Sequence, residues 1–167
     1  MTKELQSALD AAQITYENLK EIADGITSSY VNDLDEEIRE IQENIVVLTN
    51  DDLRNHIAKV STRAYFLADA RDNSTLCSTV AETLRKEVYA NTFLSAEGTQ
   101  GVKDSKSLLA TQEQTLTEAI YDLVNSRFKT KVDESHRIVD SLKTLLTSRL
   151  SEMKMTKDTE NYANQGD

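Results

Sequence analysis

The sequence contains no proline and no tryptophan, and only 4 of its 167 residues are glycine. Aromatic residues make up only 5% of the chain. All-β sandwiches and barrels need frequent turns rich in glycine and proline, and strands rich in aromatic and β-branched residues. These shortages therefore argue against a large all-β fold, and the absence of proline permits very long helices.

Cysteine and long apolar runs are scarce as well. Cys77 is the single cysteine, so no disulfide can form within the chain, and we expect a small buried apolar residue in a reducing compartment. No apolar run approaches the roughly 18 residues that a membrane span needs, and residues 1–13 lack an apolar signal segment. We therefore expect a cytoplasmic protein with no membrane partner.

The sequence does contain apolar residues at helical spacing. A first helix with Leu5, Leu9 and Ala12 on one face is expected to end at Gly25. A heptad pattern follows, with a β-branched residue at every first position. Three heptads are short for an isolated coiled coil, so we expect them to pack in a bundle or an oligomer, and we assign them to an oligomerisation seam. The seam consists of Val31, Leu34, Ile38, Ile41, Ile45 and Leu48.

The segment 49–52 (TNDD) predicts the start of another helix, because it combines a capping oxygen side chain with acids in the first turn. This helical region runs to about Leu94. Its apolar positions form two groups, one at Leu53, Ile57, Val60, Ala64 and Leu67 and the other at Leu76, Val80, Leu84 and Val88. Residues 71–75 (RDNST) either separate two helices or lie within one continuous helix.

Two of the four glycines, Gly98 and Gly101, lie three residues apart in EGTQG. The G-x-x-G pattern occurs in KH domains, where it clamps a nucleic-acid backbone, but that fold requires a sheet and no strands are predicted. A hinge between helices fits better. Gly98 can adopt a positive φ just past one helix, and Asp104 would lie in the first turn of the next.

The sequence therefore predicts an all-α fold, a long helical hairpin or coiled-coil-like bundle assembled as a homo-oligomer. Between Val102 and Lys154 there is no glycine or proline, and apolar residues recur every seven positions. We expect three regions: an acidic helical arm over residues 1–50, a helical-hairpin core over 51–155 and a disordered tail over 156–167.

Charge is distributed unevenly along the chain. The formal net charge is −10, and all of it lies within residues 1–53, because residues 54–167 are neutral overall. This asymmetry indicates either an acidic arm that engages a basic partner or a solvated helix face that aids solubility.

Signals for catalysis are weak. His56 and His136 are remote from each other and neither has a second histidine at ligand spacing, so ordinary surface or seam positions are favoured. None of the common hydrolase, phosphate-loop or calcium-loop motifs occurs. We expect no enzymatic activity, no cofactor and no bound metal.

Cations and aromatic residues alternate before the glycine turn, two lysines follow the turn, and a second cation–aromatic stretch covers residues 126–131 (SRFKTK). Single-stranded nucleic acid is bound by such surfaces, because cations pair with phosphates and ring faces stack on bases. The alternative is that the rings are seam residues and the cations are solvated. The residues that we predict to contact DNA are Arg85, Lys86, Tyr89, Phe93, Lys103, Lys106, Arg127, Lys129 and Lys131.

A cation–aromatic stretch (LRKEVY, Leu84 to Tyr89), a glycine-containing turn and a long amphipathic helix together resemble UvsY-type recombination mediators of tailed phages. The resemblance covers about residues 50–154. It implies a ring-like homo-oligomer that binds single-stranded DNA and helps to load a RecA-like recombinase onto strands covered by a single-strand binding protein. The residues of this chain that would match the DNA-binding motif of that family are Arg85, Lys86 and Tyr89.

The main alternative function is an acidic helical protein that uses residues 1–53 to bind and inhibit a host protein, as an interaction module or a DNA mimic. A third is a structural coiled-coil component without a ligand. The acidic residues 1–53 have no counterpart in the mediator pattern, and the rest of the chain is neutral instead of clearly basic.

Overall fold

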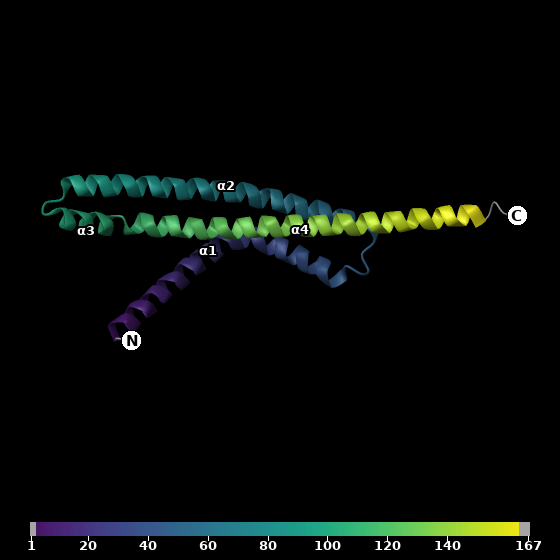
Figure 1. The fold of residues 1–167 in the computed structure, drawn as a ribbon, viewed down its shortest axis with the longest axis horizontal. Coiled ribbons are helices and arrows are strands. Elements are labelled where there is room, and N and C mark those ends of the chain that lie inside the picture. Colours follow the sequence, from purple (N-terminus) through teal and green to yellow (C-terminus); the bar gives the residue numbers. More distant parts are fainter. Residues whose placement is uncertain (1–2, 164–167) are drawn as a thin grey trace. The chain divides into compact units, whose positions relative to one another are not determined.

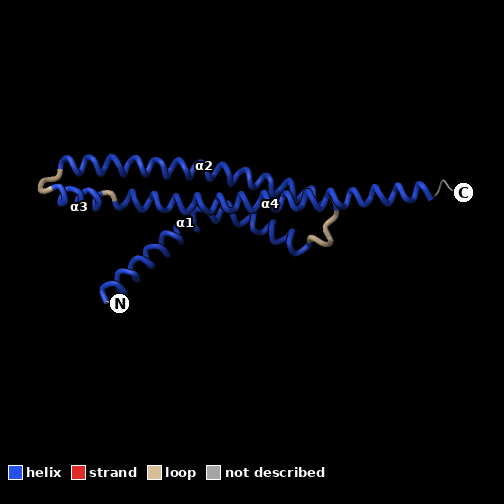
Figure 2. The backbone as a smooth tube through the Cα atoms, viewed as in Figure 1, coloured by secondary structure: helices blue, strands red, loops and turns tan. Residues whose placement is uncertain are grey.

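A computed structural model describes the backbone of residues 3–163 and the side chains of residues 15–157. The chain forms four helices, α1 (Lys3–Asn44), α2 (Asn50–Ser95), α3 (Gln100–Ala110) and α4 (Gln112–Ala163) (Figure 1). The described part of the chain contains no strand, and short loops join the helices (Figure 2). The predicted all-α fold is confirmed.

Helix α1 continues through Gly25, so the predicted stop at this residue is wrong. Ala23 and Thr27 are both buried, which places packing contacts on either side of the glycine. A glycine inside a helix costs only about 1 kcal/mol relative to alanine. Tertiary packing of the helix face outweighs that cost.

The C-terminal end of α1 comes earlier than the heptad pattern predicts. The helix ends at Asn44, and the carbonyl of this residue accepts hydrogen bonds from the N–H groups of Val47 (2.9 Å) and Leu48 (3.1 Å). Ile45 and Leu48 therefore lie in a turn instead of a helical seam.

A reciprocal capping pair starts α2, as the sequence predicts. The Asp52 N–H donates to Thr49 Oγ1 (3.2 Å), and the Thr49 N–H donates to the Asp52 carboxylate (2.9 Å). This arrangement satisfies two backbone donors at the helix start. The helix then runs without a break through residues 71–75, so of the two alternatives the single continuous helix is confirmed.

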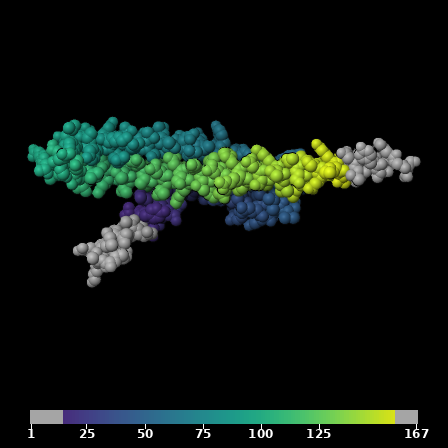
Figure 3. All heavy atoms as spheres, viewed as in Figure 1, coloured from purple at the N-terminus to yellow at the C-terminus, as the bar shows by residue number. Residues whose placement is uncertain are grey.

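Helix α2 reverses into α3 and α4 at the predicted glycine turn. Gly98 has a φ of 120°, and a Cβ added there would lie 3.1 Å from Val102 Cγ1. Both facts favour glycine at this position. After the turn, α4 lies beside α2 (Figure 3). Ser78 Oγ of α2 donates to Asp122 Oδ1 of α4 (2.8 Å).

Beyond the turn, the place of Asp104 and the end of the helical region differ from the prediction. Asp104 lies past the first turn of α3, which holds no acid. The helical region after the turn is interrupted at Thr111, whose N–H is shared between the carbonyls of Ser107 (3.2 Å) and Leu108 (3.3 Å). Helix α4 then extends to Ala163, so the expected disordered tail is wrong for residues 156–163, and residues 164–167 lie outside the described ones.

The chain divides into two compact units, and this division differs from the expected arm and core. Unit 1 comprises Met1–Ser29 and Ala68–Lys129, and unit 2 comprises Tyr30–Leu67 and Thr130–Asp167. Helices α1, α2 and α4 each contribute to both units. Each unit therefore takes part of α1, and the expected boundary of an arm at residue 50 stays a prediction.

The core of unit 2 contains most of the predicted oligomerisation seam. Leu34, Ile38 and Ile41 are buried within the single chain, and Val31 is half-buried. Leu34, Ile38 and Ile41 are therefore unavailable to a second chain, and their assignment to an oligomer interface is corrected. The other buried apolar residues of unit 2 are Leu53, Val60, Ala64, Leu67, Val132, Val139 and Leu142.

The core of unit 1 is built mainly from small residues and one large ring. Ser74 and Ala81 form the buried side of α2, and Val124 and Phe128 that of α4. Three of the four apolar residues predicted for this part of α2 instead face outward: Leu76, Val80 and Leu84 are 63%, 50% and 47% exposed. Val88 is half-buried, and Cys77, predicted to be buried, is exposed.

Candidate functional site

Unit 1 brings five of the predicted DNA-contacting residues together beside the glycine turn: Arg85, Lys86, Tyr89, Phe93 and Lys103, here called the turn-end cluster. The rings of Tyr89 and Phe93 are stacked, with centroids 6.2 Å apart and planes 14° apart. Lys103 Nζ lies 5.8 Å from the centroid of the Phe93 ring, in range of a cation–π contact. The hairpin therefore joins residues from both sides of the turn, as the sequence predicts.

Carboxylates of the same chain neutralise much of this cluster. Arg85 Nε lies 2.8 Å from a Glu118 oxygen. Lys86 Nζ lies 2.6 Å from a Glu82 oxygen. The Tyr89 hydroxyl donates to Asp104 Oδ1 (2.8 Å), and this hydrogen bond raises the pKa of Tyr89. Arg85 and Lys86, two of the cations that would meet phosphates, thus already have acidic partners.

A groove of about 790 Å³ lies along the turn-end cluster. Its size is within the range of ligand sites in proteins. Apolar side chains make up part of its wall, because Leu108 and Leu116 are exposed there. The lining residues are Arg85, Lys86, Tyr89, Leu108, Thr111, Gln112, Thr115 and Leu116.

The remaining predicted contacts are less suited to nucleic acid. Lys106 Nζ donates to the Glu97 carbonyl (3.5 Å). Arg127 forms an ion pair with Asp24, and Phe128 between two cations is only 2% exposed. The interpretation of Phe128 as a stacking ring is therefore wrong, because it is a core residue, while its neighbour Lys129 is exposed.

Lys131 belongs to unit 2 and is held by two carboxylates. Its Nζ lies 2.7 Å from Asp35 Oδ1 and 3.0 Å from Glu134 Oε2. Burial alone would lower the pKa of Lys131, but the hydrogen bonds to these acids outweigh burial and raise it. This lysine serves the structure of the unit and is not free for a phosphate.

An exposed acidic surface lies on α1 in unit 2. Asp33, Glu36, Glu40 and Glu43, here called the acidic stripe, are spaced by three, four and three residues and so share one helix face. All four are exposed, and Arg39 is paired only loosely with Glu36 at 3.7 Å. The stripe borders a cavity of about 400 Å³.

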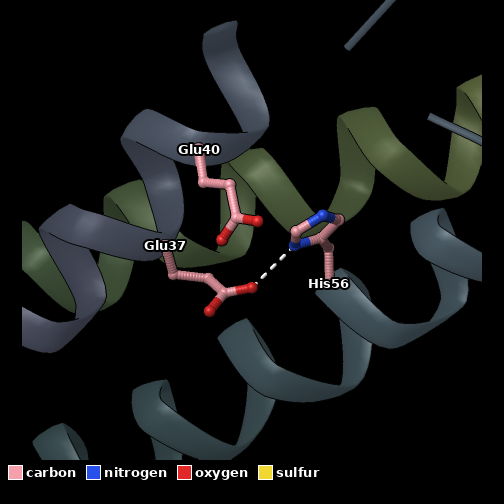
Figure 4. A group of neighbouring side chains, drawn as sticks. All are labelled: Glu37, Glu40 and His56. Carbon is pink, nitrogen blue, oxygen red and sulfur yellow. Dashed lines mark hydrogen bonds and ion pairs between the residues drawn. The ribbon is translucent and has the colours of Figure 1, made fainter. Parts of the chain in front are cut away.

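A buried carboxylate–histidine pair lies next to this stripe (Figure 4). Glu37 and His56 are 4% and 5% exposed, and His56 Nδ1–H donates to Glu37 Oε1 at 2.6 Å. Lys59 lies 3.3 Å from Oε1 and Arg63 lies 3.0 Å from Oε2. Sequence reasoning missed this pair, because it depends on how α1 and α2 align.

The pKa of Glu37 reflects these neighbours. Burial would raise it, but the hydrogen bond from His56 and the charges of Lys59 and Arg63 outweigh burial, so the pKa is lowered from its ordinary 4.5. The carboxylate is therefore ionised in the folded protein and links α1 to α2 within unit 2.

Three side chains here have the composition of a metal site. The ligand atoms of Glu37, Glu40 and His56 all lie within 4.8 Å of one another. A divalent cation would, however, compete with Lys59 and Arg63, which already neutralise Glu37 and would repel it. The geometry favours a structural ion-pair network over a metal centre.

Comparison with known proteins found no matching family, no similar curated protein and no similar solved structure. None of the helices, over the residues searched, combines the length and apolar character needed to cross a membrane. The fold defines a class only: an all-α protein of long helices, with an antiparallel hairpin in unit 1.

Proposed function

We propose that this is a non-enzymatic helical interaction protein and that the acidic stripe binds a basic segment of a partner protein. The observation that carries the proposal is the contrast between the two candidate surfaces. Asp33, Glu36, Glu40 and Glu43 remain exposed on one helix face, whereas Arg85 and Lys86 beside the turn are paired with acids of the chain.

The spacing of the stripe favours a basic helix or loop as its ligand. From Asp33 to Glu43 the axial distance is about 15 Å at 1.5 Å per residue, so the carboxylates recur roughly every 5 Å. Duplex DNA carries one charge per about 1.7 Å of its axis, and the stripe is too dilute to reproduce that density. Lysines or arginines three and four residues apart on a helix match the spacing of these carboxylates. A basic helical segment is therefore a better ligand for the stripe than a protein surface that normally binds duplex DNA.

Neutralising the stripe is expected to weaken binding of a fluorescein-labelled, lysine-rich helical peptide at least about tenfold at low salt. The variant combines Asp33→Asn, Glu36→Gln, Glu40→Gln and Glu43→Gln. Fluorescence anisotropy gives the dissociation constant, and added salt should weaken wild-type binding because these charges are solvated.

A control variant must separate this surface from overall charge. Substitution of Glu21, Glu97, Glu113 and Glu152 by Gln removes four exposed carboxylates elsewhere and leaves the same net charge. This control should keep most of the wild-type affinity. Equal losses in both variants would reduce the effect to net charge and refute the stripe as a binding site.

Single-stranded DNA binding at the turn-end cluster is the second candidate function. The observation that favours it is the stacked pair of Tyr89 and Phe93 with Lys103 beside the second ring. Stacked rings and a cation are what bases and phosphates require. This candidate function agrees with the resemblance to recombination mediators. A homo-oligomer of this chain would then present several weak sites at once and help to load a recombinase.

Replacing both Tyr89 and Phe93 by leucine is expected to weaken binding of labelled oligothymidine at least about fivefold, because each base–ring stack contributes ~1–3 kcal/mol. The matched control is Tyr65→Leu with Phe66→Leu, an exposed ring pair elsewhere on α2 whose centroids are 5.8 Å apart. If both variants bind as wild type does, or if the wild type does not bind, this candidate is excluded.

A further inference from the structure

The outward face of α2 in unit 1 is apolar at its centre and polar at its ends. Leu76, Val80 and Leu84 lie exposed along it, with Asp69 and Asn73 before them and Glu87 and Asn91 after them. At 100° per residue these seven side chains fall within one narrow stripe of the helix. We call it the α2 outer stripe.

The α2 outer stripe is symmetric about Val80 in spacing, and its residue types are complementary. The steps between its residues are four, three, four and then four, three, four. Leu76 and Leu84 lie equally far from Val80. Asp69 and Asn91 are equally far from Val80, and so are Asn73 and Glu87. Each acid therefore lies symmetrically to an asparagine. A two-fold contact between identical helices requires this kind of self-complementarity.

We propose that two copies of this chain pair through the α2 outer stripe, antiparallel, with Val80 on the two-fold axis. Leu76 then packs on Leu84 of the partner subunit. Asp69 faces Asn91 of the partner subunit, and Glu87 faces Asn73 of the partner subunit. Each carboxylate thus meets an amide that can donate a hydrogen bond, and no like charges oppose each other.

A groove beside the stripe supports the same occupant. It has a volume of about 430 Å³ between α2 and α4 and is lined by Leu76, Val80 and Leu84 together with Gln114. The antiparallel pairing would cover this groove with the apolar residues of the partner subunit's own stripe.

A single cysteine at the proposed axis tests the geometry. In a Cys77→Ser background, Val80→Cys should form a disulfide-linked dimer under mild oxidation, because the two copies of residue 80 meet at the axis. The control is Glu87→Cys in the same background. Its two copies would lie about 21 Å apart along the helix, so this variant should stay uncrosslinked. Crosslinking of both variants, or of neither, would overturn the proposal.

A second measurement keeps Cys77 and replaces the two leucines of the stripe. Sedimentation equilibrium should give a monomer–dimer equilibrium for the wild type and at least about a tenfold higher dissociation constant for Leu76→Asp with Leu84→Asp. Both leucines are exposed in the single chain, so the variant should keep its helical circular dichroism. Leu116→Asp, an exposed leucine of α4 outside the stripe, is the control. A wild type that is monomeric at all concentrations, or equal weakening by the control, refutes the interface.

Discussion

Replacement of Phe128 by alanine is expected to lower the free energy of unfolding by about 3–5 kcal/mol. Phe128 is 2% exposed and is the largest fully buried side chain among the described residues. Much of the rest of the unit 1 core is small, with Ala70, Ser74 and Ala81 on α2. Few neighbouring side chains are large enough to fill the resulting cavity. Urea denaturation followed by far-ultraviolet circular dichroism measures the loss.

The control for this experiment is Phe66→Ala, because Phe66 is 58% exposed on α2. An exposed ring away from special contacts should change stability by roughly 0.5 kcal/mol or less. The pair also separates two interpretations of Phe128. A residue that stacked on DNA bases would be solvent-facing, so similar small losses for both variants would contradict its place in the core.

Helix ends with local chemical causes could be predicted from the sequence. The Thr49–Asp52 capping pair and the positive φ of Gly98 need only neighbouring residues, and both appear where expected. The heptad over Val31 to Ile41 also identified a buried face. Its partner could not be predicted, because the same apolar stripe can face another helix of its own chain or a second chain.

The exposure of Leu76, Val80 and Leu84 could not be predicted from their spacing. Apolar residues at helical intervals usually indicate the buried face, yet α2 turns Ser74 and Ala81 toward α4. Small residues on the contact face let helix backbones approach closely, and Ser78 can then bond across the pair. The choice between two such faces depends on tertiary packing, which a single sequence does not specify.

The Glu37–His56 pair required knowledge of long-range register. The two residues are 19 positions apart on different helices, and DEE at residues 35–37 offers three acids of equal sequence character. Helix geometry separates their directions: Asp35 pairs with Lys131 while Glu37 points to His56. Only the packed arrangement distinguishes the buried acid from its exposed neighbours.

Replacement of Glu37 by glutamine is expected to lower the free energy of unfolding by about 2–3 kcal/mol near neutral pH. The change leaves His56 buried without its charged partner and removes the carboxylate that joins Lys59 to Arg63. The estimate lies below the value for a fully buried ion pair because Lys59 is half-exposed. Glu36→Gln is the matched control, since this neighbour is exposed and should cost roughly 0.5 kcal/mol or less.

The same substitution should change the pH dependence of stability. The folded pKa of Glu37 lies below the ordinary value of 4.5, so around that pH the unfolded state binds more protons than the folded state. Its contribution is complete above about pH 4.5 and is lost as the pH falls through the lowered folded value. The difference in stability between wild type and Glu37→Gln should therefore shrink on acidification below this point. A difference that stays constant with pH, or a rise in wild-type stability on addition of Zn²⁺ that Glu40→Gln abolishes, would contradict the assignment of Glu37 to a structural ion-pair network.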